Sequence, residues 1–313
     1  MSFVHCTKCG KRAVADVEYA ATSLCAKHFN EFFESKVRKA NKEFSVLRRG
    51  DKIAVAVSGG KDSAAMLYSL NALARKIGAV ELAPLLIDEG IAGYRNEAIK
   101  KAEKLCDQLG LHLTIVSFKE KYGKTLDEII AARNHKWKDE GKRTKACSYC
   151  GVLRKRSLND AALEMGANKL AVGHNADDLA QTFLMNLMRG EPMRVARFTL
   201  DEDACEEEFV PRVRPLAYCL ERENALYCML NSIPFHLDEC PYAAEAFRGI
   251  AKDFFNNAEA QYPGVKLNFV RSFLKVSKTL KQESLPKVRK CVECGAPSSK
   301  KRCKACELIA GLN

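Results

Sequence analysis

One short string constrains the fold of this chain more than any other feature of its 313 residues. An apolar run at residues 53–57 is followed directly by the sequence SGGKDS at residues 58–63, where helical spacing of apolar residues begins. Glycines let backbone amides approach phosphate oxygens, and the N-terminus of a helix adds partial positive charge. The string therefore predicts a nucleotide site at a strand-to-helix turn. It differs from a Walker A loop, because the pattern GxxxxGKS/T is absent.

The central region alternates short apolar runs with stretches of helical periodicity. Continuous apolar runs are typical of strands that are buried on both faces of a parallel sheet. Such runs lie at residues 53–57, 82–87, 111–118 and 169–173, and the helical stretches lie at residues 62–77, 94–109, 151–165 and 176–189. Because βαβ crossovers connect parallel strands, we predict an α/β fold with a doubly wound parallel sheet.

Composition and charge narrow the class of protein. The hydrophobic fraction of 47% and the charged fraction of 29% are close to globular averages, which excludes a disordered or fibrous chain. No apolar run approaches the length of a membrane span, and the first residues lack the pattern of a secretory signal. We expect a cytoplasmic protein without a membrane partner. The formal net charge of +12 favours a polyanionic partner.

Fourteen cysteines in such a chain indicate metal or redox sites rather than disulfides. Each end of the chain holds two pairs of ligands, and a gap of two residues lets both side chains of a pair reach one tetrahedral ion. The N-terminal ligands are Cys6, Cys9, Cys25 and His28, and the C-terminal ligands are Cys291, Cys294, Cys303 and Cys306. We predict one structural Zn²⁺ in each set. Cysteines that merely pack or stay free are the alternative.

These patterns divide the chain into four parts. Residues 1–30 form an N-terminal zinc module, residues 31–50 a basic helical connector, residues 51–270 a nucleotide-binding catalytic domain, and residues 271–313 a basic tail with the C-terminal zinc module. The tail has eleven Lys or Arg against three Asp or Glu. With the zinc modules and residues 136–145, it is a candidate nucleic-acid surface. Trp137 and Tyr149 are candidates for exposed aromatic residues that stack on a base. For Trp137, packing in the core or at a hinge is favoured over stacking.

Three further cysteines lie in the middle of the chain. Cys147 and Cys150 form a CxxC pair before a predicted helix, and Cys240 follows far downstream. Three thiols cannot close a tetrahedral site, so they are poor ligands for structural zinc and good candidates for a cluster with one open iron. A buried CxxC pair with an unrelated cysteine is the alternative.

The string SGGKDS resembles the signature of the PP-loop in N-type ATP pyrophosphatases, which use ATP to adenylate a carbonyl oxygen. The strings CSYCGVLRKRSLN, GHNADD, RPL and ECPY follow it in order, between the two predicted zinc modules. Over nearly the whole chain, this order resembles the TtcA family of tRNA 2-thiolation enzymes, in its archaeal and eukaryotic cytoplasmic branch. The resemblance implies a PP-loop fold of the adenine nucleotide alpha hydrolase type and an ATP-dependent tRNA uridine 2-sulfurtransferase.

The resemblance also implies a mechanism. ATP adenylates the O2 atom of uridine with release of pyrophosphate, and sulfide then displaces AMP. Cys147, Cys150 and Cys240 ligate a [4Fe-4S] cluster whose unique iron carries the sulfide; a persulfide and disulfide cycle on two of these thiols is the alternative. The residues placed to bind ATP are Val57, Ser58, Gly59, Gly60, Lys61, Asp62, Ser63, Asp88 and Gly173.

Several side chains near the loop have more than one interpretation. Lys61 would stabilise charge on the leaving pyrophosphate. Mg²⁺ would be held by Asp62 or by the pair Asp177-Asp178, and the resemblance makes one aspartate of that pair catalytic. Capping of the following helix is the alternative for the pair. Asp88 either binds the ribose or caps the loop after its strand.

The target and the partners also follow from the resemblance. The wobble uridine of the anticodon is favoured, and the T-loop uridine of tRNA is the alternative. We expect a ubiquitin-like sulfur carrier or sulfide as the donor, and a homodimer or a heterodimer with a related subunit. An enzyme that amidates a small carboxylate would need neither the cysteines nor the basic tail, and a non-catalytic RNA-binding zinc protein would not need the intact loop.

A few positions keep a structural interpretation beside the functional one. Arg154, Lys155 and Arg156 either contact phosphate or the activated base, or they lie on a solvated helix face. His174 is favoured as a packed residue at a strand end. Leu179 stands where members of the resembled family often have an acidic residue, which leaves no metal role for that position.

Overall fold

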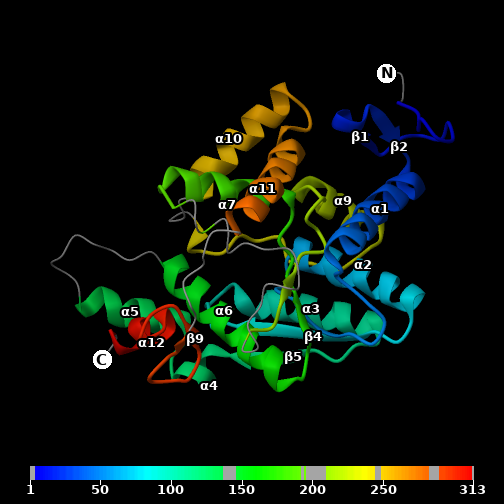
Figure 1. The fold of residues 1–313 in the computed structure, drawn as a ribbon. Coiled ribbons are helices and arrows are strands. Elements are labelled where there is room, and N and C mark those ends of the chain that lie inside the picture. Colours follow the sequence, from blue (N-terminus) through cyan, green and yellow to red (C-terminus); the bar gives the residue numbers. More distant parts are fainter. Residues whose placement is uncertain are drawn as a thin grey trace.

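The computed structural model describes residues 4–136, 146–191, 194, 209–243, 248–281 and 289–311. A five-stranded sheet lies at its centre, in the order β5-β4-β3-β6-β7, and all its neighbouring strands are parallel (Figure 1). The strands are β3 (Lys52–Ala56), β4 (Glu81–Asp88), β5 (Thr114–Ser117), β6 (Lys169–Ala171) and β7 (Arg212–Val213). The predicted α/β fold with a parallel, doubly wound sheet is confirmed.

Helices cover both faces of this sheet, which explains why its strands are continuous apolar runs. One core contains side chains from α1 (Ala26–Phe44), α2 (Lys61–Ile77), α3 (Arg95–Leu109), α7 (Ala176–Met188), α9 (Glu221–Leu230), α10 (Arg248–Gln261) and α11 (Val265–Lys281). The other core contains side chains from α4 (Phe118–Tyr122), α5 (Leu126–Lys136), α6 (Ala146–Glu164) and α12 (Lys304–Ala310). Alternate residues of β3 separate accordingly, with Ile53 and Val55 in the first core and Ala54 in the second.

The four predicted strands and the four predicted helices are all present, with ends that differ by a few residues. Strand β7 and helices α9 to α11 were not predicted. Strand β7 has two residues, which pair with Leu170 and Ala171 of β6, and so short a segment carries no periodicity of its own.

Two helices cross the boundaries that the sequence suggested. Helix α1 begins at Ala26 in the predicted N-terminal module, and Phe33 and Phe44 in the predicted connector are buried in the first core. Helix α11 runs across residue 270, and its Phe273 packs against Phe183 of α7. The connector and the start of the basic tail therefore belong to the packed core of the molecule.

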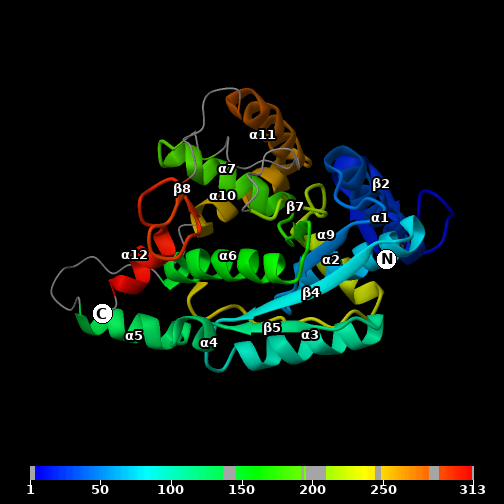
Figure 2. The ribbon, with the colours of Figure 1, turned by 60° about the horizontal axis from the view of Figure 1, so that its bottom comes forward.

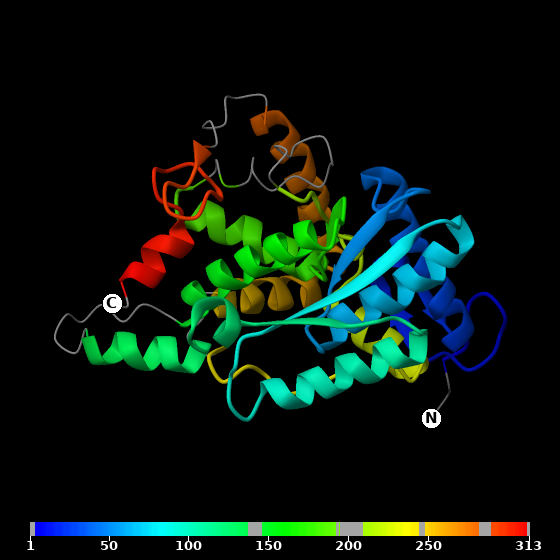
Figure 3. The ribbon, with the colours of Figure 1, turned by 90° about the horizontal axis from the view of Figure 1, so that it is seen from below.

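The small hairpins at the two ends lie far apart. Strands β1 (Ala15–Val17) and β2 (Thr22–Leu24), joined by the 3-10 helix η1 (Glu18–Ala20), precede α1, and strands β8 (Arg289–Lys290) and β9 (Pro297–Ser298) precede α12. Figures 1 and 3 place the first hairpin beside α1 and the C-terminal segment beside α5 and α6, at opposite ends of the molecule. A bound polyanion that contacts both ends must therefore span the protein.

Part of the predicted nucleic-acid surface, including Trp137 and residues 138–145, lies outside the described residues. Tyr149, predicted to be exposed, is only 6% exposed, which corrects that expectation. It lies in the second core with Leu153, and the Arg133 guanidinium stands 5.7 Å from its ring centre. Within the described ranges, the structure contains no helix that is long and apolar enough to cross a membrane.

The order of the strands reverses beside β3, because β4 lies on one side of it and β6 on the other. In open α/β sheets, ligands bind outside the carboxyl ends of the strands at such a switch point. The SGGKDS string follows β3 and the pair Gly173-His174 follows β6. The topology therefore brings these two motifs to one place.

Candidate active site

The PP-loop turns between β3 and α2 in a conformation that only glycine allows at one position. Gly59 has a φ of +84°, in the left-handed region, and a Cβ atom there would overlap the carbonyl oxygen of Ala98 on α3. Gly60 has an ordinary negative φ of −81°, and the nearest atom to a Cβ at this position would be Ser58 Oγ, at 3.6 Å. The close approach of the loop to α3 therefore depends on Gly59.

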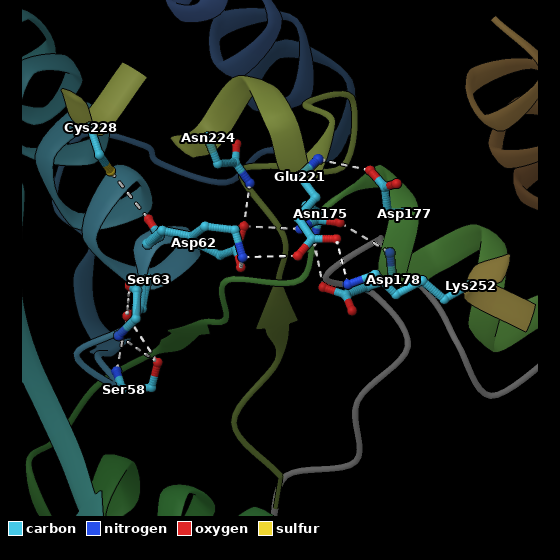
Figure 4. A network of polar contacts seen from close by, with 12 residues as sticks. Ser58, Asp62, Ser63, Asn175, Asp177, Asp178, Glu221, Asn224, Cys228 and Lys252 are labelled. Atoms are coloured by element: carbon cyan, nitrogen blue, oxygen red, sulfur yellow. Dashed lines mark hydrogen bonds and ion pairs between the residues drawn. The ribbon is translucent and has the colours of Figure 1, made fainter. Parts of the chain in front are cut away.

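Hydrogen bonds inside the PP-loop hold its backbone in place (Figure 4). The Ser63 hydroxyl donates to the carbonyl of Gly60 and accepts from the amide of Ser58, each at 3.0 Å. Gly173 packs against the other side of this turn, where a Cβ would lie 3.2 Å from the Ser63 amide nitrogen. The N-terminus of α2 is therefore ordered before any anion binds.

Asp62 connects the loop to two other elements. Its Oδ1 atom accepts a hydrogen bond from Asn175 Nδ2 at 3.0 Å and another from Asn224 Nδ2 at 2.7 Å (Figure 4). Asn175 is the N-cap of α7, and Asn224 lies on α9. These amides fix the carboxylate of Asp62 at the edge of the main cavity, which it lines together with Ser58 and Ser63.

Lys61 is held outside the main cavity. Its ammonium lies 2.9 Å from Glu221 Oε1 and 3.4 Å from Asp62 Oδ2. Glu221 also pairs with Lys252 at 3.3 Å. Lys61 lines a second cavity of about 550 Å³ beside α9. A nucleotide that recruits this ammonium must therefore draw it away from Glu221.

The two aspartates at the start of α7 lie in different surroundings. Asp178 completes a capping box, because its carboxylate accepts from the Asn175 amide at 3.2 Å, and it pairs with Arg248 at 2.7 Å. Burial raises the pKa of Asp178 to about 6; Arg248 opposes this rise and the charge of Asp62 adds to it. A divalent cation between Asp62 and Asp178 would relieve that repulsion, so these two carboxylates fit Mg²⁺.

Asp177 does not share this position. It accepts hydrogen bonds from the Lys266 ammonium and from the backbone amide of Glu221, and it is buried. It lines the second cavity together with Lys61. The predicted pair is therefore divided, with only Asp178 close to Asp62 and with Asp177 in the packing between α7, α9 and α11.

The main cavity has a volume of about 790 Å³ and opens at the switch point of the sheet. One part of its lining is apolar and comes from the sheet and α6, namely Ala56, Val57, Leu85, Ile87, Leu158 and Val172. An apolar slot of this kind at the carboxyl ends of parallel strands suits a nucleobase. Of the residues predicted for ATP, Val57, Ser58, Asp62, Ser63 and Gly173 line this cavity.

Asp88 does not line either cavity. Its carboxylate accepts a hydrogen bond from the Gly90 amide at 2.8 Å, which is the loop-capping role that the sequence left open. Glu89, the next residue, lines the main cavity and is buried. It pairs with Arg95 at 2.9 Å and with Arg154 at 3.5 Å. Sequence reasoning missed Glu89, although its place directly after a buried strand was a signal for it.

The remaining lining is mostly cationic. Eight Lys or Arg side chains line the main cavity, against the two carboxylates of Asp62 and Glu89. His174 lines it as well, and its ring nitrogen Nδ1 is buried without a hydrogen-bond partner. Burial, followed by the charges of Arg214 and Arg248, lowers the pKa of His174 well below the ordinary value, so this imidazole is neutral. Arg248, distant in sequence, was not predicted.

The three central cysteines meet beside this cavity. Cys147 and Cys150 lie on the first turns of α6, and the Cys147 thiol donates to the Tyr242 carbonyl at 3.4 Å, next to the segment that carries Cys240. Burial raises the pKa of Cys150 to about 11, while Arg154 opposes this rise and the other two thiols add to it. Cys150 and Cys240 pack at the edge of the second core.

These thiols do not form a site for a single ion. Among the described residues, only the two terminal sets bring their ligand atoms within 4.8 Å of one another. Three neighbouring thiols that are more widely spaced, with Arg154 beside them to offset negative charge, fit an iron–sulfur cluster, which spreads its thiolates over several irons. The chemistry of the donor set therefore agrees with the predicted cluster.

Both terminal ligand sets are assembled. Cys6 Sγ lies 3.3 Å from His28 Nδ1, and Cys9 Sγ lies 3.7 Å from Cys25 Sγ. In the C-terminal set, all four sulfur atoms lie within 4.8 Å of one another. Four soft ligands converging on one point are what a structural Zn²⁺ requires, so the residues fit the predicted metal in both sets.

Comparisons with known proteins agree with this geometry. Residues 29–257 match the PP-loop domain family. The chain is 40% identical over 291 residues to the cytoplasmic tRNA 2-thiolation protein 1 of Caenorhabditis elegans, covering 93% of this chain and 75% of the relative. It is 37% identical over 311 residues to the protein of the same name from Chlamydomonas reinhardtii, covering 98% of this chain and 85% of the relative.

A solved structure is similar over the whole chain. It is described as the U34-tRNA thiolase NcsA from Methanococcus maripaludis with its [4Fe-4S] cluster. The TM-score is 0.82 at 31% sequence identity, and the match covers 100% of this chain and 98% of the other. The sequence, the fold and the arrangement of the site therefore point to one conclusion: this chain belongs to the PP-loop domain family and, within it, to the family of the cytoplasmic tRNA 2-thiolation protein 1.

Proposed function

We propose that this protein is an ATP-dependent tRNA 2-thiouridine synthetase of the cytoplasm, which transfers sulfur to the wobble uridine of the anticodon. One observation carries the proposal: a single cavity joins the PP-loop to an apolar slot and a cationic wall, and the three neighbouring cysteines lie at its side on α6 and the segment around Cys240. The family membership and the U34-tRNA thiolase of similar structure support the substrate.

The PP-loop residues bind the polyphosphate of ATP in this proposal. The amides after Ser58 and the N-terminus of α2 face the pyrophosphate, and Lys61 leaves Glu221 to stabilise its developing charge. Asp62 and Asp178 would hold Mg²⁺, which would offset the negative charge of the phosphates. The apolar slot takes the adenine, so that the α-phosphorus lies between the loop and the cysteine-bearing end of α6.

The uridine enters from the open side of the cavity. Its O2 atom attacks the α-phosphorus, the bond to pyrophosphate breaks, and the adenylate makes O2 a good leaving group at C2. Cys147, Cys150 and Cys240 would hold the [4Fe-4S] cluster, which would bind the sulfide from the donor. Sulfide adds at C2, and AMP departs with O2. Because His174 is neutral in this cationic cavity, it is suited to hydrogen bonding with the base rather than to neutralising phosphate.

The remaining parts of the chain have supporting roles. We propose that Zn²⁺ in each terminal set stabilises its module and that both modules contact tRNA. The sulfur comes from a ubiquitin-like carrier or from sulfide. The protein acts as a homodimer or with a related subunit, and the exposed apolar side chains of Ile250 and Phe254 on α10 offer a face for that contact. Sedimentation velocity with and without an Ile250→Glu, Phe254→Glu variant tests the assembly.

The proposed reaction is tested with iron-loaded protein, ATP, sulfide and unmodified tRNA under anaerobic conditions. Nuclease digestion and mass spectrometry locate any 2-thiouridine. We expect sulfur at the wobble position, and sulfur in the T-loop would reassign the target. The Cys240→Ala variant should bind ATP but form no thiouridine, whereas Cys106→Ala, which removes a buried thiol of α3 far from the cluster site, should remain active. Equal activity of both variants would overturn the role of the three cysteines.

A further inference from the structure

The wall of the main cavity that lies between α6 and α7 is strongly cationic. Lys155 of α6, Arg212 of β7 and Arg189 at the end of α7 all line it. Figure 2 shows the C-terminal segment around α12 beside α6, and α12 packs against α6. The wall is therefore built from three elements, one of which, α6, also contacts the C-terminal module.

Lys155 is the centre of this wall. It is exposed to the cavity, and within the part of the chain that the structure describes its ammonium makes no hydrogen bond and no ion pair. Arg212 Nη2 donates to the backbone carbonyl of Lys155 at 3.0 Å, which brings a second cation next to it. Partial desolvation, and then the charges of Arg212 and Arg154, lower the pKa of Lys155. Such crowding of like charges is unfavourable until an anion binds.

The phosphates of ATP do not account for this anion. The PP-loop amides serve the polyphosphate, and Lys61 reaches it once the ammonium leaves Glu221. The cations nearest the loop have carboxylate partners, because Arg95 pairs with Glu89 at 2.9 Å and Arg248 pairs with Asp178 at 2.7 Å. Among the residues that the structure describes, Lys155 has no such carboxylate beside it, and it therefore offers a place for a second negatively charged group at its end of the cavity.

The surroundings of Lys155 indicate which anion this is. Arg156 is the next residue of α6, and its Nη1 atom lies 3.6 Å from Cys294 Sγ of the C-terminal metal set. Three exposed basic residues lie close to that set in the sequence, namely Lys290, Lys300 and Lys301. Basic side chains therefore lie where α6 meets the C-terminal module, one residue along α6 from Lys155. A base that enters a pocket from a single-stranded loop brings its flanking phosphodiesters to the mouth with it.

We propose that Lys155, together with Arg212, is a receptor for the RNA phosphodiester adjacent to the uridine that enters the cavity. The inference rests on the proposed function and adds a positioning site to it. Lys155 holds the backbone of the splayed nucleotide, and the cavity reads the base. It is a positioning residue and takes no part in adenylation or sulfur transfer.

The test uses the full-length, metal-loaded protein and an anticodon stem-loop RNA of about 17 nucleotides that carries an unmodified wobble uridine. We expect Lys155→Ala to weaken RNA binding about tenfold or more, since a hydrogen bond to a charged group is lost. The dependence of log K on log salt should become shallower by about one. ATP affinity should stay unchanged, and Lys155→Arg should restore RNA binding. Lys100→Ala, which removes an exposed lysine of α3 outside the cavity, is the matched control.

Neutral methylphosphonate linkages identify the phosphate. With the wild-type protein, one linkage beside the wobble uridine should weaken binding as much as Lys155→Ala does, and the variant should be insensitive to that same linkage. The inference would be overturned if every linkage, including the one beside the wobble uridine, weakened RNA binding of Lys155→Ala as much as that of the wild-type protein. It would also be overturned if Lys155→Ala lost ATP affinity but kept its RNA binding. If the wild-type protein thiolates tRNA while Lys155→Ala binds RNA normally, the inference fails and the proposed function stands. If the wild-type protein binds no stem-loop RNA, both fail.

Discussion

Replacement of Gly59 by alanine tests whether the PP-loop depends on close packing against α3. The new Cβ would overlap the Ala98 carbonyl, and the φ of +84° would have to be adopted by an L-residue. The left-handed conformation costs roughly 1–2 kcal/mol and overpacking roughly 1–3 kcal/mol, so we expect a loss of about 2–5 kcal/mol. If the loop moves instead of the fold unfolding, the same cost appears as a lower affinity for ATP.

Gly60→Ala is the matched control, because its φ is negative and the nearest atom to its Cβ is 3.6 Å away. Its cost at the N-cap of α2 should stay below about 1 kcal/mol. Urea unfolding followed by circular dichroism, without nucleotide, measures stability, and isothermal titration measures ATP binding. Equal unfolding midpoints and equal ATP affinities for Gly59→Ala and Gly60→Ala would refute the steric argument.

Three further predictions follow from the contacts of the site. Glu89→Gln should destabilise the fold by about 3–5 kcal/mol in urea unfolding, because it leaves two arginines beside a buried neutral group; a change below 1 kcal/mol would contradict this. The raised pKa of Asp178, about 6, means that the folded state binds its proton more tightly than the unfolded state. This stabilisation is complete below pH 3.8 and is lost through pH 6, so wild type should lose up to about 3 kcal/mol relative to Asp178→Asn between pH 4 and pH 7. Cys294→Ser should lower both RNA affinity and iron content, whereas Cys25→Ser should retain iron, as measured by iron assay after anaerobic loading.

The expected loss of iron in Cys294→Ser differs from what the sequence alone suggests. Two separate zinc modules and a separate cluster site predict that loss of the C-terminal metal leaves the iron content near normal. In the structure, however, Cys291 and Cys303 lie in the same core as Tyr149 and Leu153 of α6, the helix that carries two of the thiols proposed to hold the cluster. Loss of this metal should therefore loosen α6. No motif shows this contact, because it joins segments more than a hundred residues apart.

Local features of the fold were predictable because each is encoded in a short stretch. The strand, the glycine turn and the helix around the PP-loop follow one another directly, and both terminal metal sets have their ligands at regular spacing. The division of Asp177 from Asp178 also follows from local geometry, since successive residues of a helix project about 100° apart and cannot face one site equally. The sequence interpretation overlooked this and treated the two aspartates as a pair.

The cationic wall was not predictable from the sequence. Lys155, Arg212 and Arg248 lie on a central helix, an edge strand of two residues and a distant helix. Only the topology of the sheet brings them to one cavity, and a chain with a net charge of +12 offers many arginines with no such role. The same holds for Lys61, whose pairing with Glu221 depends on how α9 packs against α2.

The central claim is that this cavity adenylates O2 of the wobble uridine before sulfur replaces it. The most direct measurement uses tRNA that carries ¹⁸O at the O2 atom of that uridine, with iron-loaded protein, ATP and sulfide under anaerobic conditions. Mass spectrometry of the products should find the ¹⁸O in AMP, none in pyrophosphate, and sulfur at the labelled nucleotide. Thiouridine formed with the label in water or in orthophosphate, or with unlabelled AMP, would contradict the account.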